Sequence, residues 1–444
     1  MTRFLILLII CTPCFAQKPL TPKKAYKTID RMFSEKESTR KKATQKIIES
    51  RDESLLPALV EAVFFNTHGL KETVEALETM TGLKYGANYK AWISYIGSRE
   101  DITPMPGYLK YKGRLYGMID PKLEAFFDPK FKPTIRPVEI LSGGVKKDGI
   151  PALMNPEFIS AKQARFLKDD EKVFGVAING DVRAYTHRVM DWHEMANDVV
   201  GGVPVSLSYC TLCGSGILFD TSKAKGGPYT FGSSGLLYRS NKLMYDHQTD
   251  TLWSNMTGEP VMGKLVGSGV TIDILPLTIT TWGEWKALHP DTKVLSLNTG
   301  FSRDYRPGAA YGSYFASPDT MFPVWNAASS DERAKKDWMW VAVLNGKRNA
   351  WAVKDLQKPP FRMDTIGDAP VAIITNPSTG SVRVFDTSGQ TLSFEKGALT
   401  VDGKKLRITE DALISEDKSI IFKRVPGHGA YWFSWSSFFP DLAR

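Results

Sequence analysis

Cysteine is scarce in this 444-residue chain. It has four cysteines, and two of them, Cys11 and Cys14, fall in an N-terminal segment that we expect to be removed. Two cysteines cannot form a disulfide framework of the kind that stabilises small secreted domains. The remaining pair, Cys210 and Cys213, therefore needs a specific explanation.

Long apolar runs and several well-known catalytic motifs are also missing. After the N-terminal segment, no run approaches the roughly 18 apolar residues that a membrane helix needs, so we predict no transmembrane segment. The Gly-Ser-Ser-Gly stretch at 232–235 is not followed by Lys-Ser/Thr, which excludes a phosphate loop. No nucleophile elbow, zinc-protease helix or dinucleotide-binding fingerprint occurs in a suitable context.

The N-terminus has the features of a secretory signal peptide. Arg3 precedes an apolar run, Phe4–Cys11, and Cys-Phe-Ala comes directly before Gln17. This pattern predicts cleavage after Ala16 and a periplasmic or secreted product without a membrane anchor.

The net charge of +9 is concentrated in a lysine-rich stretch from Lys18 to Lys46. We favour solvated helix faces over a nucleic-acid site, because an exported protein rarely meets its host's nucleic acid. No nucleic-acid partner is expected.

The chain divides by pattern into a helical part and a β-rich part, which predicts an α+β protein. After the signal peptide (1–16), residues 17–98 read as short helical hairpins that resemble a HEAT-like repeat, suited to packing or to a protein partner. Residues 99–150, rich in Pro and Gly, read as a connector packed on the β-rich part. Two β-rich units are then expected, at 151–325 and 326–444, with helical insertions near 161–167, 191–199 and 282–289.

An internal repeat supports the two units. Asn179-Gly180 recurs as Asn345-Gly346, and Phe219-Asp-Thr-Ser222 recurs as Phe385-Asp-Thr-Ser388 at the same spacing in the chain. The shared residues are glycines, prolines, aromatics and small apolar residues, which build turns and cores. We interpret them as an internal duplication with a degenerate second copy.

The two copies differ at the residues with reactive side chains. Cys210 corresponds to Asn376, Cys213 to Thr379 and His193 to Pro359. Because the second copy can form its fold without these groups, their presence in the first copy points to function.

The cysteines lie in Tyr209-Cys-Thr-Leu-Cys-Gly214, between two apolar strand-like segments. A turn of this form suits a metal knuckle, with the glycine in a left-handed conformation, and the same spacing suits a redox disulfide. An inert local disulfide is the structural alternative, but it would close a very small loop and stabilise little.

His193 lies upstream in Asp191-Trp-His-Glu-Met-Ala-Asn-Asp198. On a helix, His193 and Asn197 would share a face, as would Glu194 and Asp198. His193 with the two thiolates would give three metal ligands and one open position, a pattern typical of catalytic zinc or copper sites. Glu194, Asn197 and Asp198 would orient the histidine, and Tyr209 and Ser215 would flank the centre. The alternative for His193 is a buried histidine that satisfies a backbone carbonyl.

Residues 231–253 are dense in polar and aromatic side chains between glycines, and they could line a pocket. Asp246 and His247 are the acid–base candidates there. The alternative is a set of hairpin side chains that bond to one another.

An ordered series of motifs resembles the bacterial family called domain of unknown function 3179. The residues that carry this resemblance, from roughly 130 to 444, are Trp192-His-Glu, Asn197-Asp, Tyr209-Cys-Thr-Leu-Cys-Gly, Phe231-Gly-x-Ser-Gly, Met244-Tyr-Asp, Trp282-x-x-Trp285 and His289-Pro290. Thr211 stands where the family pattern has Pro, and His247 stands where many members carry Arg. The resemblance implies the same domain and a prominent role for His193, Cys210 and Cys213, and it implies no particular reaction.

The sequence therefore predicts an exported protein with a metal- or thiol-based centre at His193, Cys210 and Cys213, an oxidoreductase or a metal-dependent hydrolase. Glu194 and Asp246 are the further catalytic candidates. The alternative is a non-enzymatic protein that binds a ligand or copper and recruits a partner through its N-terminal helices.

Overall fold

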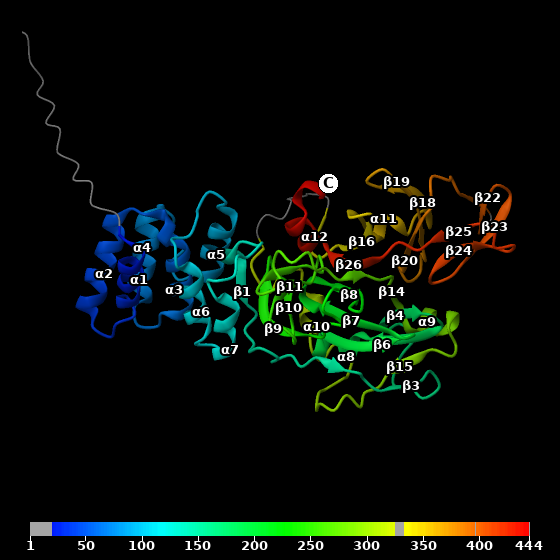
Figure 1. Cartoon of the computed structure of the whole chain (residues 1–444), viewed down its shortest axis with the longest axis horizontal. Helices are drawn as coiled ribbons and strands as arrows, with labels where there is room; N and C mark the ends of the chain where they lie inside the picture. Colours follow the sequence, from blue (N-terminus) through cyan, green and yellow to red (C-terminus); the bar gives the residue numbers. More distant parts are fainter. Residues whose placement is uncertain (1–19, 325–332, 396, 444) are drawn as a thin grey trace, which may run out of the picture.

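The computed structural model describes residues 20–324, 333–395 and 397–443, so the predicted signal peptide lies outside the described residues. The molecule is elongated, with a helical part at one end and β-sheets filling the middle and the other end (Figure 1). Within the described ranges, no helix is long and apolar enough to cross a membrane.

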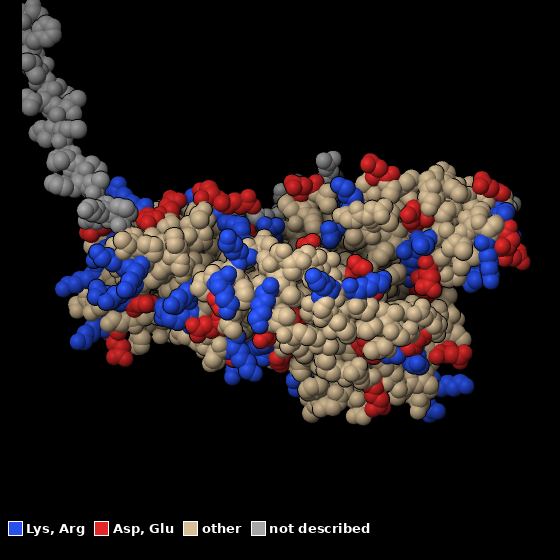
Figure 2. Space-filling model, in the orientation of Figure 1, with Lys and Arg blue, Asp and Glu red and all other residues tan. Residues whose placement is uncertain are grey.

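The helical part begins with five helices that form short antiparallel hairpins. Their apolar faces bury one residue per turn or more, among them Ile29, Ile47, Leu59 and Trp92. Most of the lysines of the 18–46 stretch that the structure describes are exposed, and Figure 2 shows basic side chains over this end of the molecule. The helices are α1 Pro22–Arg31, α2 Glu37–Ser50, α3 Leu56–Phe65, α4 Leu70–Thr81 and α5 Tyr89–Ser98.

Residues 99–150 are more structured than the connector expected from their Pro and Gly content. They add helices α6 (Tyr108–Tyr116) and α7 (Pro121–Glu124) to the helical core and end in strand β1 (Ile140–Ser142). Lys112 of α6 is fully buried, pairs with Glu61 and donates to the carbonyl of Ile140 at 2.7 Å. Because β1 pairs with β9, this contact joins the helices to the sheets.

The first β-rich region contains three five-stranded sheets, in the orders β1-β9-β10-β11-β12, β13-β8-β7-β6-β2 and β14-β4-β5-β15-β3. Its elements are β2 Leu153–Met154, β3 Phe158–Ser160, β4 Lys172–Ile178, β5 Asp181–Thr186, α8 His187–His193, β6 Met195–Val200, β7 Val203–Cys210, β8 Ser215–Asp220, β9 Phe231–Tyr238, β10 Asn241–Asp246, β11 Leu252–Ser254, β12 Pro260–Met262, β13 Asp273–Ile274, β14 Thr278–Thr281, α9 Trp282–Leu288, β15 Lys293–Leu295 and α10 Gly312–Ala316.

The second β-rich region has smaller sheets, in the orders β17-β16-β26, β18-β19-β20 and β21-β22-β23-β24-β25. Its elements are β16 Trp338–Leu344, β17 Lys347–Ala352, α11 Val353–Leu356, β18 Phe361–Ile366, β19 Ala369–Thr375, β20 Val382–Asp386, β21 Ser393–Glu395, β22 Ala398–Val401, β23 Lys404–Ile408, β24 Ala412–Ser415, β25 Ile421–Lys423, β26 Gly427–Tyr431 and α12 Trp432–Phe438.

The two regions place corresponding elements at constant spacings in the chain. Strands β4, β5 and β6 are each separated from β16, β17 and β18 by the same spacing as the repeated Asn-Gly pairs. Further on, Thr281 of β14 pairs with Lys172 of β4, and Tyr431 of β26 pairs with Trp338 of β16 in the same way. The separation in the chain between Thr281 and Tyr431 is shorter than that between Lys172 and Trp338. The Trp-x-x-Trp helices α9 and α12 follow directly at this shorter spacing.

Three helical insertions were expected from the sequence. The one at 282–289 contains α9, the one at 191–199 is cut short, and the one at 161–167 is absent. Helix α8 ends at His193, Glu194 takes a left-handed conformation with φ 53°, and Met195–Val200 is strand β6. The β-sheet pairing of β6 with β7 outweighs the local helical pattern of 191–199. Residues 161–167 form turns.

Candidate functional site

The Cys-x-x-Cys segment forms the predicted turn between two strands. Strand β7 ends at Cys210, a single 3-10 turn (Thr211–Cys213) follows, and Gly214 takes the left-handed conformation with φ 62° before β8 begins. A β-carbon at Gly214 would lie 2.6 Å from the ring of Trp338, so glycine is required here for space as well as for its backbone.

Both cysteines are free thiols in the interior. Cys210 is 3% exposed and Cys213 is fully buried, and both pack against Phe433 of the second β-rich region. The Cys213 thiol donates to the carbonyl of Ser240 at 2.9 Å. Burial raises the pKa of Cys213, and its hydrogen bond with Cys210 raises it further. The two cysteines belong to one buried cluster, with Cys213 as the deeper one.

Cys210 lies on the wall of a small cavity of about 80 Å³. Three other ionisable side chains line it: Glu194, Lys242 and Tyr311. The remaining lining residues are Gly143, Val145, Ile150, Leu212, Ser233, Gly235, Leu236, Leu237, Met321 and Phe322. The cavity thus combines one thiol, one carboxylate, one amine and one phenol within an apolar surround.

Glu194 and Lys242 form a buried ion pair beside the thiol. The Lys242 ammonium donates to the backbone carbonyl of Glu194 at 2.9 Å and lies 3.4 Å from its carboxylate. The same carboxylate accepts from the hydroxyl of Thr211, 3.0 Å away, and from that of Tyr311, 3.3 Å away. Burial lowers the pKa of Lys242, and the nearby Glu194 and Cys210 oppose this shift. A cation near the thiol favours the thiolate form.

Asp191 is a second carboxyl in this region. Burial, and then the negative charge of Glu194, raise its pKa from 3.8 to about 7. One of its oxygens is buried without a hydrogen-bond partner among the described residues. Strongly perturbed carboxyls of this kind concentrate at functional sites.

His193 does not join the cysteines. Its Nδ1 lies 2.8 Å from the carbonyl of Pro151, and its Nε2 lies 2.6 Å from the hydroxyl of Tyr305. Both ring nitrogens are thus engaged elsewhere, as expected for a buried histidine that satisfies a backbone carbonyl. Burial lowers its pKa, which the bond to Pro151 partly offsets.

The structure does not bring His193 together with Cys210 and Cys213. Over residues 20–324, 333–395 and 397–443, no three or more His, Cys, Asp and Glu side chains are grouped so as to hold a metal ion. The physical reason is the end of helix α8 at His193, which turns Glu194, and not the histidine, toward the cysteine strand. Binding of zinc or copper stays a prediction.

Two of the residues expected to orient His193 have other partners. The Asn197 amide bonds both to the carbonyl of Phe231, at 2.8 Å, and to its amide nitrogen, at 2.9 Å, which ties β6 to β9. Asp198 accepts from Arg183 at 2.6 Å and from Tyr185 at 2.5 Å. These contacts hold the sheets together and do not reach His193.

The flanking candidates also have defined places. Ser215 accepts from Asn241 at 2.9 Å and from Asn255 at 3.3 Å, in a buried amide network behind the cysteine turn. Tyr209 is buried and lines a different, larger cavity.

Asp246 is fully buried and accepts from Thr249, Thr251 and Trp253, so its carboxylate organises a hairpin. His247 packs on the ring of Tyr245. These contacts match the alternative of hairpin side chains that bond to one another.

Lys242 and Tyr311 were missed in the sequence. The sequence held one weak indication of Lys242. It is the only charged residue among the first five residues of β10, and every residue of this strand is buried. A lysine within a fully buried strand requires a partner, and Glu194 could be identified as that partner only from the tertiary structure.

Comparison with known proteins agrees with the motif series. A family model described as "Protein of unknown function (DUF3179)" matches residues 147–442, which confirms the resemblance seen in the sequence. No curated protein and no solved structure matches the chain.

Proposed function

We propose a thiol-based function for this chain, which belongs to the DUF3179 family of proteins of unknown function. In this proposal the chain is a thiol–disulfide oxidoreductase, with Cys210 as the attacking thiol and Cys213 as the resolving thiol. The observation that carries the proposal is the cavity in which Cys210 lies beside Lys242 and Glu194, with Cys213 in contact behind it.

The positions of the two sulfurs support different roles for them. Cys210 borders the cavity, so a substrate sulfur can reach it, whereas Cys213 is fully buried and has a raised pKa. Lys242 lines the same cavity as Cys210 and places an amine within reach of a substrate there. The cavity volume of about 80 Å³ favours a slender sulfur-bearing chain over a bulky one.

The chemistry balances as a two-electron exchange. The Cys210 thiolate attacks one sulfur of a substrate disulfide, forms a mixed disulfide and releases the other sulfur as a thiolate that takes up a proton. Cys213 then loses its proton and attacks the Cys210 sulfur, which releases the second substrate thiol. The substrate disulfide is reduced and the dithiol is oxidised to a Cys210–Cys213 disulfide. A dithiol donor returns the pair to the thiol state.

Export is part of the proposal. Cleavage after Ala16 would deliver the chain to the periplasm or the exterior, where a Cys pair cycles between thiol and disulfide forms. The scarcity of other cysteines in the mature chain supports a dedicated role for this pair.

We also infer that the two β-rich regions arose by internal duplication. The constant spacings between corresponding strands, pairings and Trp-x-x-Trp helices support this inference. The spacing between corresponding elements is shorter after β8 and β20 than before them. The reason is that the segment β9 to β13, inserted in the first region, is longer than the segment β21 to β25, inserted in the second. Lys242 belongs to that first insertion, which adds the cavity wall opposite Cys210.

Trapping of the mixed disulfide tests the proposal. The Cys213→Ser variant should accumulate a stable adduct with 2-hydroxyethyl disulfide at Cys210, identified by peptide mass spectrometry under native conditions. The Cys210→Ser variant should form no adduct, because Cys213 is shielded. Wild type should yield the internal disulfide instead.

The Lys242→Met variant tests whether Lys242 contributes to the reactivity of Cys210, beyond the accessibility of the thiol. Loss of this cavity amine should lower the rate of Cys210 alkylation at neutral pH by about tenfold, because a cation close to a cysteine increases its reactivity. An adduct at Cys213 in place of Cys210 would overturn the proposal. So would stoichiometric zinc or copper that is lost in Cys210→Ser, because a metal would then occupy both sulfurs.

A further inference from the structure

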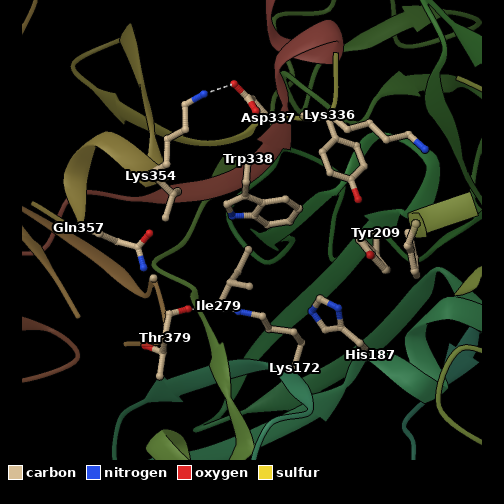
Figure 3. Close-up of a pocket in the computed structure, with 14 residues that line it drawn as sticks. Lys172, His187, Tyr209, Ile279, Lys336, Asp337, Trp338, Lys354, Gln357 and Thr379 are labelled. Carbon is tan, nitrogen blue, oxygen red and sulfur yellow. Dashed lines mark hydrogen bonds and ion pairs between the residues drawn. The ribbon is translucent and has the colours of Figure 1, made fainter. Parts of the chain in front are cut away.

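A second and larger cavity lies between the two β-rich regions. Its volume is about 500 Å³, within the range of about 300–1,000 Å³ that is usual for small-molecule sites. The first region contributes Lys172, His187, Tyr209, Ile279 and Phe315. The second contributes Lys336, Asp337, Trp338, Val353, Lys354, Gln357, Thr379, Gly380 and Tyr431 (Figure 3).

The charge of this cavity is positive and only partly compensated. Among its described lining residues there are three lysines and one carboxylate. Asp337 pairs with Lys354 at 2.6 Å (Figure 3), and Lys336 donates to the carbonyls of Tyr314 and Ser317. Among the described residues, Lys172 donates one hydrogen bond, to the carbonyl of Thr379 at 3.2 Å.

Lys172 is therefore the cation with unused donors. Lys172 is an exposed residue at the start of β4, and its side chain lines the cavity. Partial desolvation lowers its pKa, and the charge of Glu284 opposes that shift. An anion that enters the cavity can accept a charge-assisted hydrogen bond from this ammonium.

His187 lies beside Lys172 on the same wall (Figure 3). It stacks on Phe174 with ring centres 4.1 Å apart, and its Nε2 is shielded and has no hydrogen-bond partner among the described residues. Burial, and then the charge of Lys172, lower its pKa to about 3, so the ring is neutral at neutral pH. A neutral imidazole can offer one directed hydrogen bond to a ligand at no cost in charge.

Trp338 and Ile279 supply an apolar part of the lining. The ring of Trp338 faces the cavity above Ile279 (Figure 3) and meets Tyr431 edge-on, with ring centres 5.5 Å apart. Tryptophan and tyrosine rings bind planar ligand bodies well, because they bury large areas with little loss of conformational freedom.

We propose that this cavity binds a small organic anion with a flat apolar body, whose anionic group bonds to Lys172 and His187 and whose body packs on Trp338 and Ile279. The site is separate from the cysteine cavity. Tyr209 and Cys210 are neighbours on β7, but Tyr209 borders this cavity and Cys210 borders the other.

A fluorescent aromatic sulfonate tests the site directly. Titration with 8-anilinonaphthalene-1-sulfonate at neutral pH should show one saturable site in wild type. Lys172→Met should weaken binding by about tenfold or more, and Lys172→Arg should restore most of the affinity because it keeps the charge. Trp338→Leu should also weaken binding.

Lys162→Met is the matched control, since Lys162 is an exposed lysine outside the cavity and its loss changes the net charge equally. It should bind as wild type does, and thermal unfolding should show that every variant is folded. Equal affinity in wild type and Lys172→Met, or an equal loss in Lys162→Met, would overturn the proposal. Cys210→Ser should bind normally, so failure here and failure of the thiol function are distinguishable.

Discussion

The two β-rich regions share a framework and differ in what they attach to it. Strands β4 to β8 and β16 to β20 follow the same order with the same pairing, yet Cys210 and Cys213 correspond to Asn376 and Thr379, and Asp191 to Gln357. The ionisable residues of the cysteine cavity come from the first region, where the β9–β13 insertion supplies Lys242. The second region has the same strand order without these groups, so the fold does not need them. Variants of the first region can therefore be compared with variants at the corresponding positions of the second, or with a control.

The largest expected effect concerns the attacking thiol. Cys210→Ser should abolish formation of the mixed disulfide, whereas Asn376→Ser, at the corresponding position, should leave its rate unchanged. Adduct formation measured by mass spectrometry checks both. An equal loss in Asn376→Ser would mean that the turn geometry, and not the thiol, limits the reaction.

The next effect is a pH dependence carried by Asp191. Its pKa is raised to about 7 in the folded state from 3.8, so the folded protein binds the extra proton between these values and its stability falls as the pH rises through that window. Asp191→Asn should remove this loss and gain up to about 4 kcal/mol at pH 8 relative to pH 4, at about 1.4 kcal/mol per pKa unit.

Urea unfolding of wild type and Asp191→Asn at pH 4, 6 and 8 measures that gain. Asp368→Asn, an exposed residue in the turn between β18 and β19, is the control and should give no pH-dependent difference. A constant difference between wild type and Asp191→Asn at all three pH values would contradict the assignment.

A smaller difference is expected at the two turn glycines. Gly214 and Gly380 both have a left-handed backbone, with φ 62° and 72°. A methyl group at Gly214 would meet the Trp338 ring at 2.6 Å, whereas at Gly380 it would meet a Val353 methyl at 3.1 Å. Gly214→Ala should therefore cost about 2 kcal/mol more than Gly380→Ala, which should cost about 1 kcal/mol. Equal free energies of unfolding for the two variants would show that Trp338 moves aside freely.

The smallest effects concern the Trp-x-x-Trp helices, which contact the opposite region through corresponding residues. Glu284 of α9 accepts from Ser381 at 2.8 Å and from Thr379, and Ser434 of α12 accepts from Asn241 at 3.1 Å. Glu284→Gln and Ser434→Ala should each lower the free energy of unfolding by about 0.5–1.5 kcal/mol. Denaturant unfolding measures both free energies. If either variant is as stable as wild type, the contact of that helix with the opposite region does not stabilise the protein.

The sequence by itself determined much of the scaffold. The repeated Asn-Gly pairs marked the turns after β4 and β16, and the repeated Phe-Asp-Thr-Ser segments marked the ends of β8 and β20, whereas β6 was expected to be helical. Gly214 after the second cysteine indicated a left-handed turn, because turns are local properties. The motif series also identified the family.

Only the tertiary structure decided which side chains meet. A helical pattern over 191–198 placed His193 toward the cysteines, but pairing of Met195–Val200 in a sheet ended the helix and brought Glu194 there instead. Lys242 reaches Glu194 from an insertion further along the chain, and the larger cavity exists only because the two regions face each other. Contacts between residues distant in the chain depend on the packing of whole sheets, which no local pattern encodes.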